Sequence, residues 1–233
     1  AGRNYIQGGC LTVEYHKIET LFERNDSFKV TDKLKNPVYG IIKTWHVTEK
    51  IDGTNIRVTL EKEGKIIFGG KTDNASIPSP LLMVLMNMFS AEKLKEVFWK
   101  NRGQGIEPCK AILYGEGYGP GIQKGGSYRK SSAPTFRLFD VLIEDKWWLS
   151  WENTVDVAYK LGIQTVPFLG EWSLEKIVST VKDGFPSVVA VEEGGVDGFK
   201  AEGIVGRPVE ALFDKKGHRL ILKLKTKDFT GKL

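Results

Sequence analysis

One short segment of the sequence has residue types and a spacing that could do covalent chemistry. The residues from Glu49 to Asn55 read EKIDGTN, so Lys50 and Asp52 stand at alternate positions. Alternate residues of a strand point to the same side, which would place an amine and a carboxylate on one face where a strand ends. A neutral lysine amine is a nucleophile, and a carboxylate can hold a cation. A surface ion pair beside a hairpin turn is the alternative, and this segment alone leaves both interpretations open.

Four later segments could supply partners for such a lysine. Two of them offer a carboxylate: Glu116 in LYGEGYG directly after an apolar strand, and Glu202 in KAEGIV on a strand. A third, LILKLKTKDF, places Lys223 and Lys225 two residues apart, hence on one face of a strand. The fourth, FRLFDV at 136–141, offers aromatic rings. Each segment has an ordinary structural explanation by itself, but the five follow one order across nearly the whole chain.

Two glycine-rich stretches lack the standard phosphate-binding patterns. GGKT at 69–72 resembles the end of a Walker A motif, but the first glycine of that motif would have to stand at Lys65. The glycines of GEGYGPG at 115–121 do not have the G-x-G-x-x-G spacing. The sequence therefore excludes a P-loop and a Rossmann fingerprint.

Strands and helices in mixed order must position these residues. We expect strands at 45–60 (two, around the Asp-Gly turn), 65–68, 111–114 (running into a Gly-rich turn), 136–143, 147–151, 199–205 and 219–225, and helices at 80–100, 152–161 and 173–182. This order favours an α+β domain over a regular βαβ array.

The composition is that of a globular protein with a local excess of positive charge. The 233 residues include 34 Lys and Arg against 29 Asp and Glu, a net charge of +5, and the stretch from Arg207 to Leu233 carries 8 basic and 3 acidic residues. The excess therefore belongs to one cationic element on a neutral body. No apolar run could span a bilayer and no signal peptide is visible. Cys10 and Cys109 form neither a metal spacing nor a disulfide framework, so a reducing cytoplasm is expected.

The ordered segments resemble the motifs of the covalent nucleotidyltransferase superfamily, which contains polynucleotide ligases and mRNA capping enzymes. EKIDGTN, LYGEGYG, FRLFDV, KAEGIV and LILKLKTKDF correspond to its motifs I, III, IIIa, IV and V. The form EKIDGTN, with GGKTDNA and the early YHKIETLFER, is most similar to ATP-dependent RNA ligases, in particular the RNA ligase 2-like branch common in phages. The resemblance covers residues 14 to 229.

This resemblance implies an α+β nucleotidyltransferase (ATP-grasp-like) domain of two antiparallel sheets flanked by helices. It implies a single domain over 1–233 without the C-terminal OB-fold or RNA-binding domain of many relatives, and it leaves room for a protein partner in that place. The expected substrate is RNA with 5′-phosphate and 3′-hydroxyl ends, nicked or bridged. The expected location is the cytoplasm, that of the host cell if a phage encodes the protein.

The resemblance also implies a reaction in three steps with ATP and Mg²⁺ (or Mn²⁺) as cofactors. Lys50 forms lysyl-AMP, AMP passes to an RNA 5′-phosphate, and a 3′-hydroxyl displaces AMP. A free lysine has a pKa of about 10.4 and is mostly protonated at neutral pH. We therefore expect burial, together with the cations Lys223 and Lys225 and a bound metal ion, to lower the pKa of Lys50.

The remaining site residues are likewise implied by the resemblance. The expected catalytic residues are Lys50, Lys223, Lys225 and Glu202, and the expected ATP-binding residues are Thr48, Glu49, Asp52, Gly53, Asn55, Arg57, Lys71, Glu116 and Phe136. Phe136 is expected to stack on adenine and Phe139 to belong to the core. Asp52, Glu202 and Glu116 are expected to hold the metal ion through waters. The more terminal cations (Lys215, Lys216, Arg219, Lys227 and Lys232) are expected to contact the RNA backbone.

Three other functions remain as alternatives. An ATP-dependent DNA ligase and a GTP-dependent capping-type guanylyltransferase would use the same lysine chemistry. A non-enzymatic RNA-binding module would use none of it, and the combination of Lys50, Glu202, Lys223 and Lys225 argues against that function.

Overall fold

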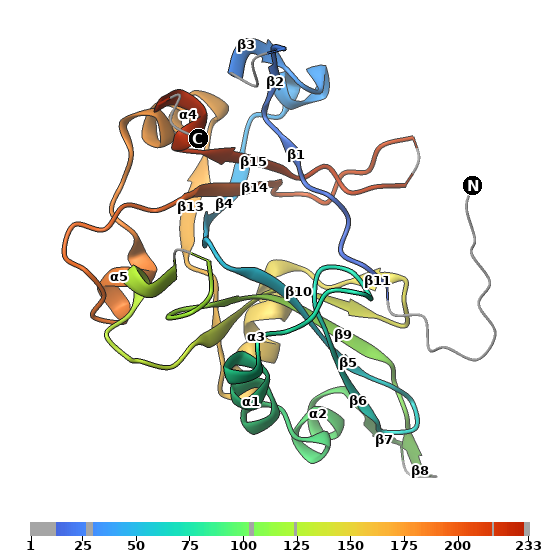
Figure 1. The fold of residues 1–233 in the computed structure, drawn as a ribbon. Coiled ribbons are helices and arrows are strands. Elements are labelled where there is room, and N and C mark those ends of the chain that lie inside the picture. Colours follow the sequence, from blue (N-terminus) through green and yellow to red (C-terminus); the bar gives the residue numbers. More distant parts are fainter. Residues whose placement is uncertain (1–12, 27–29, 103–104, 124, 216, 231–233) are drawn as a thin grey trace.

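The structure is a computed structural model that describes residues 13–26, 30–102, 105–123, 125–215 and 217–230. Cys10, Lys216 and Lys232 lie outside these ranges. Two larger sheets form the body of the protein (Figure 1), and the chain passes from one to the other between β4 and β5. The α+β expectation is confirmed.

The first sheet has five strands, of which all neighbours are antiparallel except the edge pair β1–β15. Its order is β1 (Glu19–Thr20), β15 (Leu222–Lys225), β14 (Gly203–Pro208), β4 (Trp45–Lys50) and β13 (Phe168–Trp172).

The second sheet has the order β11 (Trp147–Trp148), β10 (Thr135–Ile143), β9 (Ala111–Tyr118), β5 (Thr54–Leu60) and β6 (Ile66–Gly69). The short strand β12 (Gln164–Thr165) runs parallel to β10, so this sheet is mixed as well. Two small hairpins pair β2 (Phe22–Arg24) with β3 (Val30–Leu34), and β7 (Lys100–Arg102) with β8 (Gly105–Glu107).

Helices cover one face of each sheet. They are α1 (Ser79–Met88), α2 (Ala91–Phe98), α3 (Trp151–Leu161), α4 (Leu174–Asp183), α5 (Val188–Glu192) and α6 (Lys227–Thr230), with 3₁₀ turns η1 (Pro37–Ile41) and η2 (Gly125–Tyr128). Apolar residues of α1, α2 and α3 share a core with the second sheet, and those of α4 share a core with the first. None of the described helices is long and apolar enough to cross a membrane.

The segment at 45–60 forms two strands, as expected, but they belong to different sheets. The turn from Ile51 to Gly53 therefore links the sheets instead of closing a hairpin. A Cβ on Gly53 would lie 2.3 Å from the carbonyl oxygen of Gly117, so only glycine fits where this turn meets β9. This close approach fixes Lys50, at the end of β4, next to the second sheet.

Other elements also differ from the sequence expectation. The strand expected at 199–205 begins only at Gly203, and the strand expected at 147–151 ends at Trp148. The expected helix at 80–100 is two helices, because the chain extends at Phe89 and restarts at Ser90, whose Oγ accepts from the Lys93 N–H. The expected turn after Tyr114 is instead a continuation of β9 through Gly115 and Gly117. These glycines make room for neighbouring side chains and do not turn the chain.

Candidate active site

A cleft of about 380 Å³ lies between the two sheets. It collects residues from separate elements that the sequence analysis singled out: Thr48, Glu49, Lys50, Gly53, Asn55, Lys71, Glu116, Lys223 and Lys225. Four expected site residues do not line it: Asp52, Arg57, Phe136 and Glu202. Most of the expected site residues are thus brought together from positions up to 177 residues apart in the sequence.

Lys50, which lines this cleft, forms an ion pair with Glu202. Its Nζ donates to Glu202 Oε2 at 2.6 Å, and the Nζ of Lys225 donates to the other oxygen of the same carboxylate. The pairing register of the sheet explains the triad, because Gly203 lies opposite both Lys50 on β4 and Lys225 on β15. Glu202 lies directly before β14 and not on it, which corrects the sequence expectation.

The charge balance around Lys50 differs from the expectation. Burial favours the neutral amine, but the carboxylates of Glu202 and Glu116 outweigh it and hold the pKa of Lys50 above its usual range. Burial thus acts in the expected direction, but the protein's own charges around Lys50 do not lower its pKa. Burial and the ammonium groups of Lys225 and Lys50 lower the pKa of Lys223 instead. Among the described residues Lys223 has no ion-pair partner.

Glu116 lies in the middle strand of the second sheet, opposite Asn55 on β5. Burial raises the pKa of Glu116 to about 7, and the charges of Glu202 and Asp52 add to this effect while Lys50 opposes it. Three carboxylates thus repel one another beside Lys50, an arrangement that a cation would relieve. Within the described part of the chain no group of three or more His, Cys, Asp or Glu could hold a metal ion directly. That Asp52, Glu116 and Glu202 hold a metal ion through waters therefore stays a prediction.

Glu49 has a structural partner in this arrangement. Its buried carboxylate accepts from Ser187 Oγ at 2.5 Å and from the N–H groups of Val188 and Val189 at 2.8 and 3.2 Å. These contacts cap the first turn of α5. Thr48, one residue earlier, donates from Oγ1 to the carbonyl of Val205 at 3.4 Å. Both residues line the cleft, but the Glu49 carboxylate is already hydrogen-bonded to the start of α5.

Arg57 lies beneath the loop that carries Lys71. Its guanidinium is 1% exposed and donates to the Gly70 carbonyl and to Asp73 Oδ1, both at 2.8 Å. Arg57 therefore holds the loop from 69 to 73 against the sheet, while Lys71 reaches the cleft. The expectation that Arg57 touches the nucleotide does not agree with this placement.

The two phenylalanines of β10 lie in different surroundings. Phe136 is 1% exposed and packs edge-on against Phe89 of the core, with ring centroids 5.5 Å apart, whereas Phe139 lines the cleft and also packs against two core clusters. The expectation that Phe139 belongs to the core therefore holds in part, while Phe136 does not line the cleft as adenine stacking would require. The two residues are three positions apart, so strand alternation puts them on opposite faces but does not tell which face meets the cleft.

Several cleft residues were missed by the sequence reasoning. Tyr15, His16 and Arg207 line the cleft near Phe139. They surround the buried Asp140, which accepts from Tyr15 Oη at 2.8 Å and from Arg219 Nη2 at 2.6 Å. Arg219, expected at the RNA backbone, instead stacks on Trp148 with its side chain 9% exposed. The only available signal was the early YHKIET stretch, noted as part of the resemblance.

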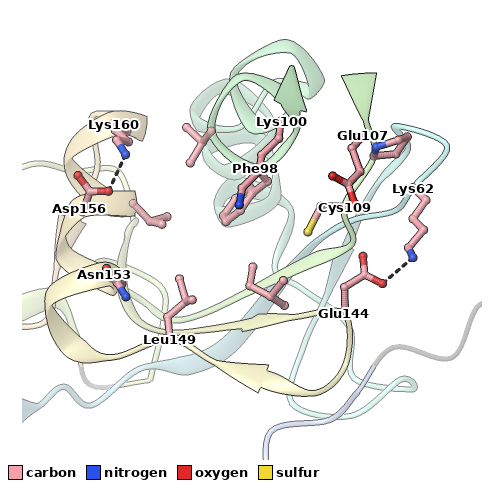
Figure 2. A pocket seen from close by; sticks show the side chains of 14 residues that line it. Lys62, Phe98, Lys100, Glu107, Cys109, Glu144, Leu149, Asn153, Asp156 and Lys160 are labelled. Carbon is pink, nitrogen blue, oxygen red and sulfur yellow. Dashed lines mark hydrogen bonds and ion pairs between the residues drawn. The ribbon is translucent and has the colours of Figure 1, made fainter. Parts of the chain in front are cut away.

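A second hollow, of about 600 Å³, lies between α2, α3 and the ends of β8, β10 and β11 (Figure 2). None of the expected site residues lines it. Figure 2 shows Lys62 facing Glu144 and Lys160 facing Asp156, with Nζ–O distances of 2.5 and 2.6 Å. These charges neutralise one another, whereas those in the cleft include cations without a carboxylate partner.

The fold matches that of solved RNA ligase structures. A mutant of Naegleria gruberi RNA ligase without ligand has a TM-score of 0.60 and 20% identity over 92% of this chain and 58% of that one. A mutant with ATP and Mn gives 0.61 and 19% over 93% and 62%, and the enzyme with PPi gives 0.61 and 20% over 96% and 63%. The present chain thus spans less than two thirds of these proteins. No curated protein sequence matches it.

A match of the sequence to a family model identifies the family. The family model for RNA ligase matches residues 43–225, from just before β4 to the end of β15. The chain belongs to the RNA ligase family of enzymes.

Proposed function

We propose that this protein is an ATP-dependent RNA ligase that joins RNA 5′-phosphate and 3′-hydroxyl ends through a covalent lysyl-AMP intermediate. The observation that carries the proposal is the position of Lys50: its amine lies 2.6 Å from Glu202, in a cleft shared with Lys223 and Lys225. An amine, a half-buried carboxylate and nearby lysine cations are the groups that nucleotidyl transfer needs. The sequence form EKIDGTN favours the RNA ligase 2-like, phage-type branch.

Lys50 is the nucleophile in this proposal, and the Glu202 ion pair is its resting state. Burial is the largest single influence on the pKa of Lys50 and acts to lower it. Once the charge of Glu202 is neutralised, burial favours the neutral amine. A divalent metal ion, when bound with ATP, would supply that positive charge, and Asp52, Glu116 and Glu202 are the oxygens that would hold its water ligands.

The rest of the cleft binds the nucleotide in this proposal. Phe139 and Val205 are apolar surfaces for the adenine ring, next to Thr48 and Glu49. Asn55 and Glu116 are polar groups within reach of the ribose. Lys71, Lys223 and Lys225 neutralise the phosphates.

In the later steps AMP would pass to the RNA 5′-phosphate, and the 3′-hydroxyl would displace it. We propose that the described residues form one nucleotidyltransferase unit that accepts nicked or bridged RNA ends. The match of the family model over residues 43–225 supports RNA as the substrate class.

Nucleotide labelling followed by sealing tests this function. The protein is incubated with Mg²⁺ and α-labelled ATP or GTP, and then with nicked RNA or an all-DNA nick. The proposal predicts acid-labile covalent label from ATP and sealing that favours RNA 3′-hydroxyl ends. Label from GTP only would indicate a guanylyltransferase, and equal sealing of the DNA nick would indicate a DNA ligase. Folded protein that takes no label would indicate a binding module.

A further inference from the structure

Helix α5 is hydrogen-bonded to both sheets. At its start, Glu49 of β4 accepts from Ser187 Oγ at 2.5 Å and from two backbone N–H groups at 2.8 and 3.2 Å. At its end, Glu192 Oε2 lies 2.7 Å from Nη1 of Arg137 on β10. Because β4 belongs to the first sheet and β10 to the second, this five-residue helix connects the two.

The connection at Arg137 is buried and made by several groups. The Arg137 side chain is 3% exposed, and its Nη2 lies 3.1 Å from Oε1 of Glu193, the residue after α5. Its Nε donates to Tyr118 Oη at 2.8 Å, and that hydroxyl donates in turn to Glu193. A planar guanidinium with several such partners is held in one orientation. Arg137 therefore fixes the end of α5 against the second sheet.

The other end of α5 lies beside Lys50. Glu49 directly precedes Lys50 on β4, and Ile51, which follows it, shares a buried apolar cluster with Val189 of α5. Both chain neighbours of Lys50 thus adjoin the helix. The ion pair of Lys50 with Glu202, next to β14, stays within the first sheet and does not place the amine relative to the second.

Arg137 stands on the face of the second sheet that meets the cleft. It lies directly opposite Glu116 of β9, and residues opposite one another in an antiparallel pair have their side chains on the same face. Glu116 lines the cleft, as does Phe139, two residues after Arg137. The path from Arg137 through α5 to Glu49 therefore relates the position of Lys50 to that of the cleft residues on the opposite sheet.

We propose that Arg137 is a positioning residue of lysine adenylylation, which acts through α5 and Glu49 on the place of the Lys50 amine. The inference rests on the proposed function. In this step the Lys50 ammonium loses one proton to solvent, and its nitrogen forms a bond to the α-phosphorus. The bond to the bridging oxygen breaks with its electrons on pyrophosphate, and a second proton leaves the nitrogen for solvent. Arg137 does not line the cleft, so it acts on this step through the helix.

A comparison of two partial reactions tests this role. AMP transfer to Lys50 at saturating ATP needs the amine in place, whereas sealing of a nicked RNA whose 5′ end already carries AMP forms no bond to Lys50. A misplacement of about 1 Å can slow a reaction about a hundredfold, so Arg137→Met should slow AMP transfer about tenfold or more and the sealing less than about threefold. Equal slowing of both reactions would indicate a general loss of structure and overturn the inference, as would unchanged AMP transfer.

Lys110→Met is the matched control. Lys110 is also a largely buried cation, and its Nζ pairs with Asp145 at 3.0 Å. It directly precedes β9, six residues before Glu116, and does not line the cleft. Lys110→Met should keep the AMP-transfer rate of the parent protein. A loss as large as that of Arg137→Met would overturn the inference, because the loss of any buried cation would then suffice.

A milder variant decides the question if Arg137→Met does not fold. The side chain of Glu192 is 47% exposed, so Glu192→Gln should fold and should slow AMP transfer about threefold. In a Glu49→Gln background the same change should slow it less, because the connection is already weakened at its other end. Equal slowing in both backgrounds, or none in either, would overturn the inference.

The parent protein separates this inference from the proposed function. If it takes up AMP on Lys50 but AMP transfer depends on neither Arg137 nor Glu192, the positioning role alone is wrong. If the folded parent protein takes up no AMP from ATP, the proposed function is wrong, and with it the positioning role.

Discussion

The different surroundings of two phenylalanines on β10 yield a matched prediction, because the same substitution should have different effects at the two positions. Phe136→Leu removes part of a ring that is 1% exposed and packs on Phe89 and over Gly115. We expect a loss of about 1–1.5 kcal/mol in unfolding free energy, a fall in Tm of about 2–6 °C, and an unchanged KM for ATP. Phe139→Leu keeps an apolar side chain beside Tyr15 but removes the flat face at the cleft. Losing about 1 kcal/mol of base stacking should raise the KM for ATP about fivefold, with less effect on Tm.

The assay measures both quantities on both variants. Thermal unfolding followed by circular dichroism gives Tm, and the rate of covalent AMP incorporation against ATP concentration gives KM. The reasoning is refuted if Phe136→Leu raises the KM for ATP while Phe139→Leu lowers only Tm. That outcome would place Phe136, and not Phe139, at the base.

Three further predictions concern the surroundings of the cleft. Glu49→Ala leaves three donors at the start of α5 without their acceptor and should cost about 3 kcal/mol in urea unfolding, whereas Glu49→Gln should cost less; equal costs would reject the capping role. Gly53→Ala puts a Cβ 2.3 Å from a carbonyl oxygen of β9 and should cut the adenylylation rate more than tenfold. Gly126→Ala, with nothing within 4 Å, is its control, and similar rates in both variants would contradict the close approach. Burial and Arg207 lower the pKa of His46 from 6.5 to about 4, so the unfolded state takes up the proton first. The free energy of unfolding is therefore highest above pH 6.5 and decreases as the pH falls toward 4. His46→Gln should reduce the difference in unfolding free energy between pH 7.5 and pH 4.5, measured by urea unfolding, by about 2 kcal/mol. An unchanged difference would contradict this prediction.

The sequence predicted the elements around the nucleophile well, because local patterns determine them. The alternating Val, Ile and Thr residues around the Asp-Gly turn predicted the two strands on either side of Gly53, and the two-residue spacing predicted the shared face of Lys223 and Lys225. What it could not predict is that these strands separate into different sheets. That separation depends on the contact of Gly53 with Gly117, 64 positions later in the chain.

The incorrect expectations also arise from contacts between residues that lie far apart in the sequence. Gly115 and Gly117 look like turn residues, but they lie inside β9 because the ring of Phe136 and the side chain of Leu81 occupy the space that a Cβ would take. Strand alternation puts Phe136 and Phe139 on opposite faces of β10, but it does not show which face meets the cleft, because the first sheet that closes the cleft is formed by residues far away in the sequence. The raised pKa of Lys50 follows from Glu202, whose position beside the amine is set by the register of three strands.

The most direct test of the central claim is to locate the covalent nucleotide. The protein is incubated with ATP and Mg²⁺, digested under basic conditions, and its peptides are analysed by mass spectrometry, beside Lys50→Ala and the control Lys62→Ala, whose residue lines the second hollow and not the cleft. The account predicts one AMP per chain, attached to Lys50, present in Lys62→Ala and absent from Lys50→Ala. AMP on another residue of the parent protein, or retained in Lys50→Ala, would contradict it.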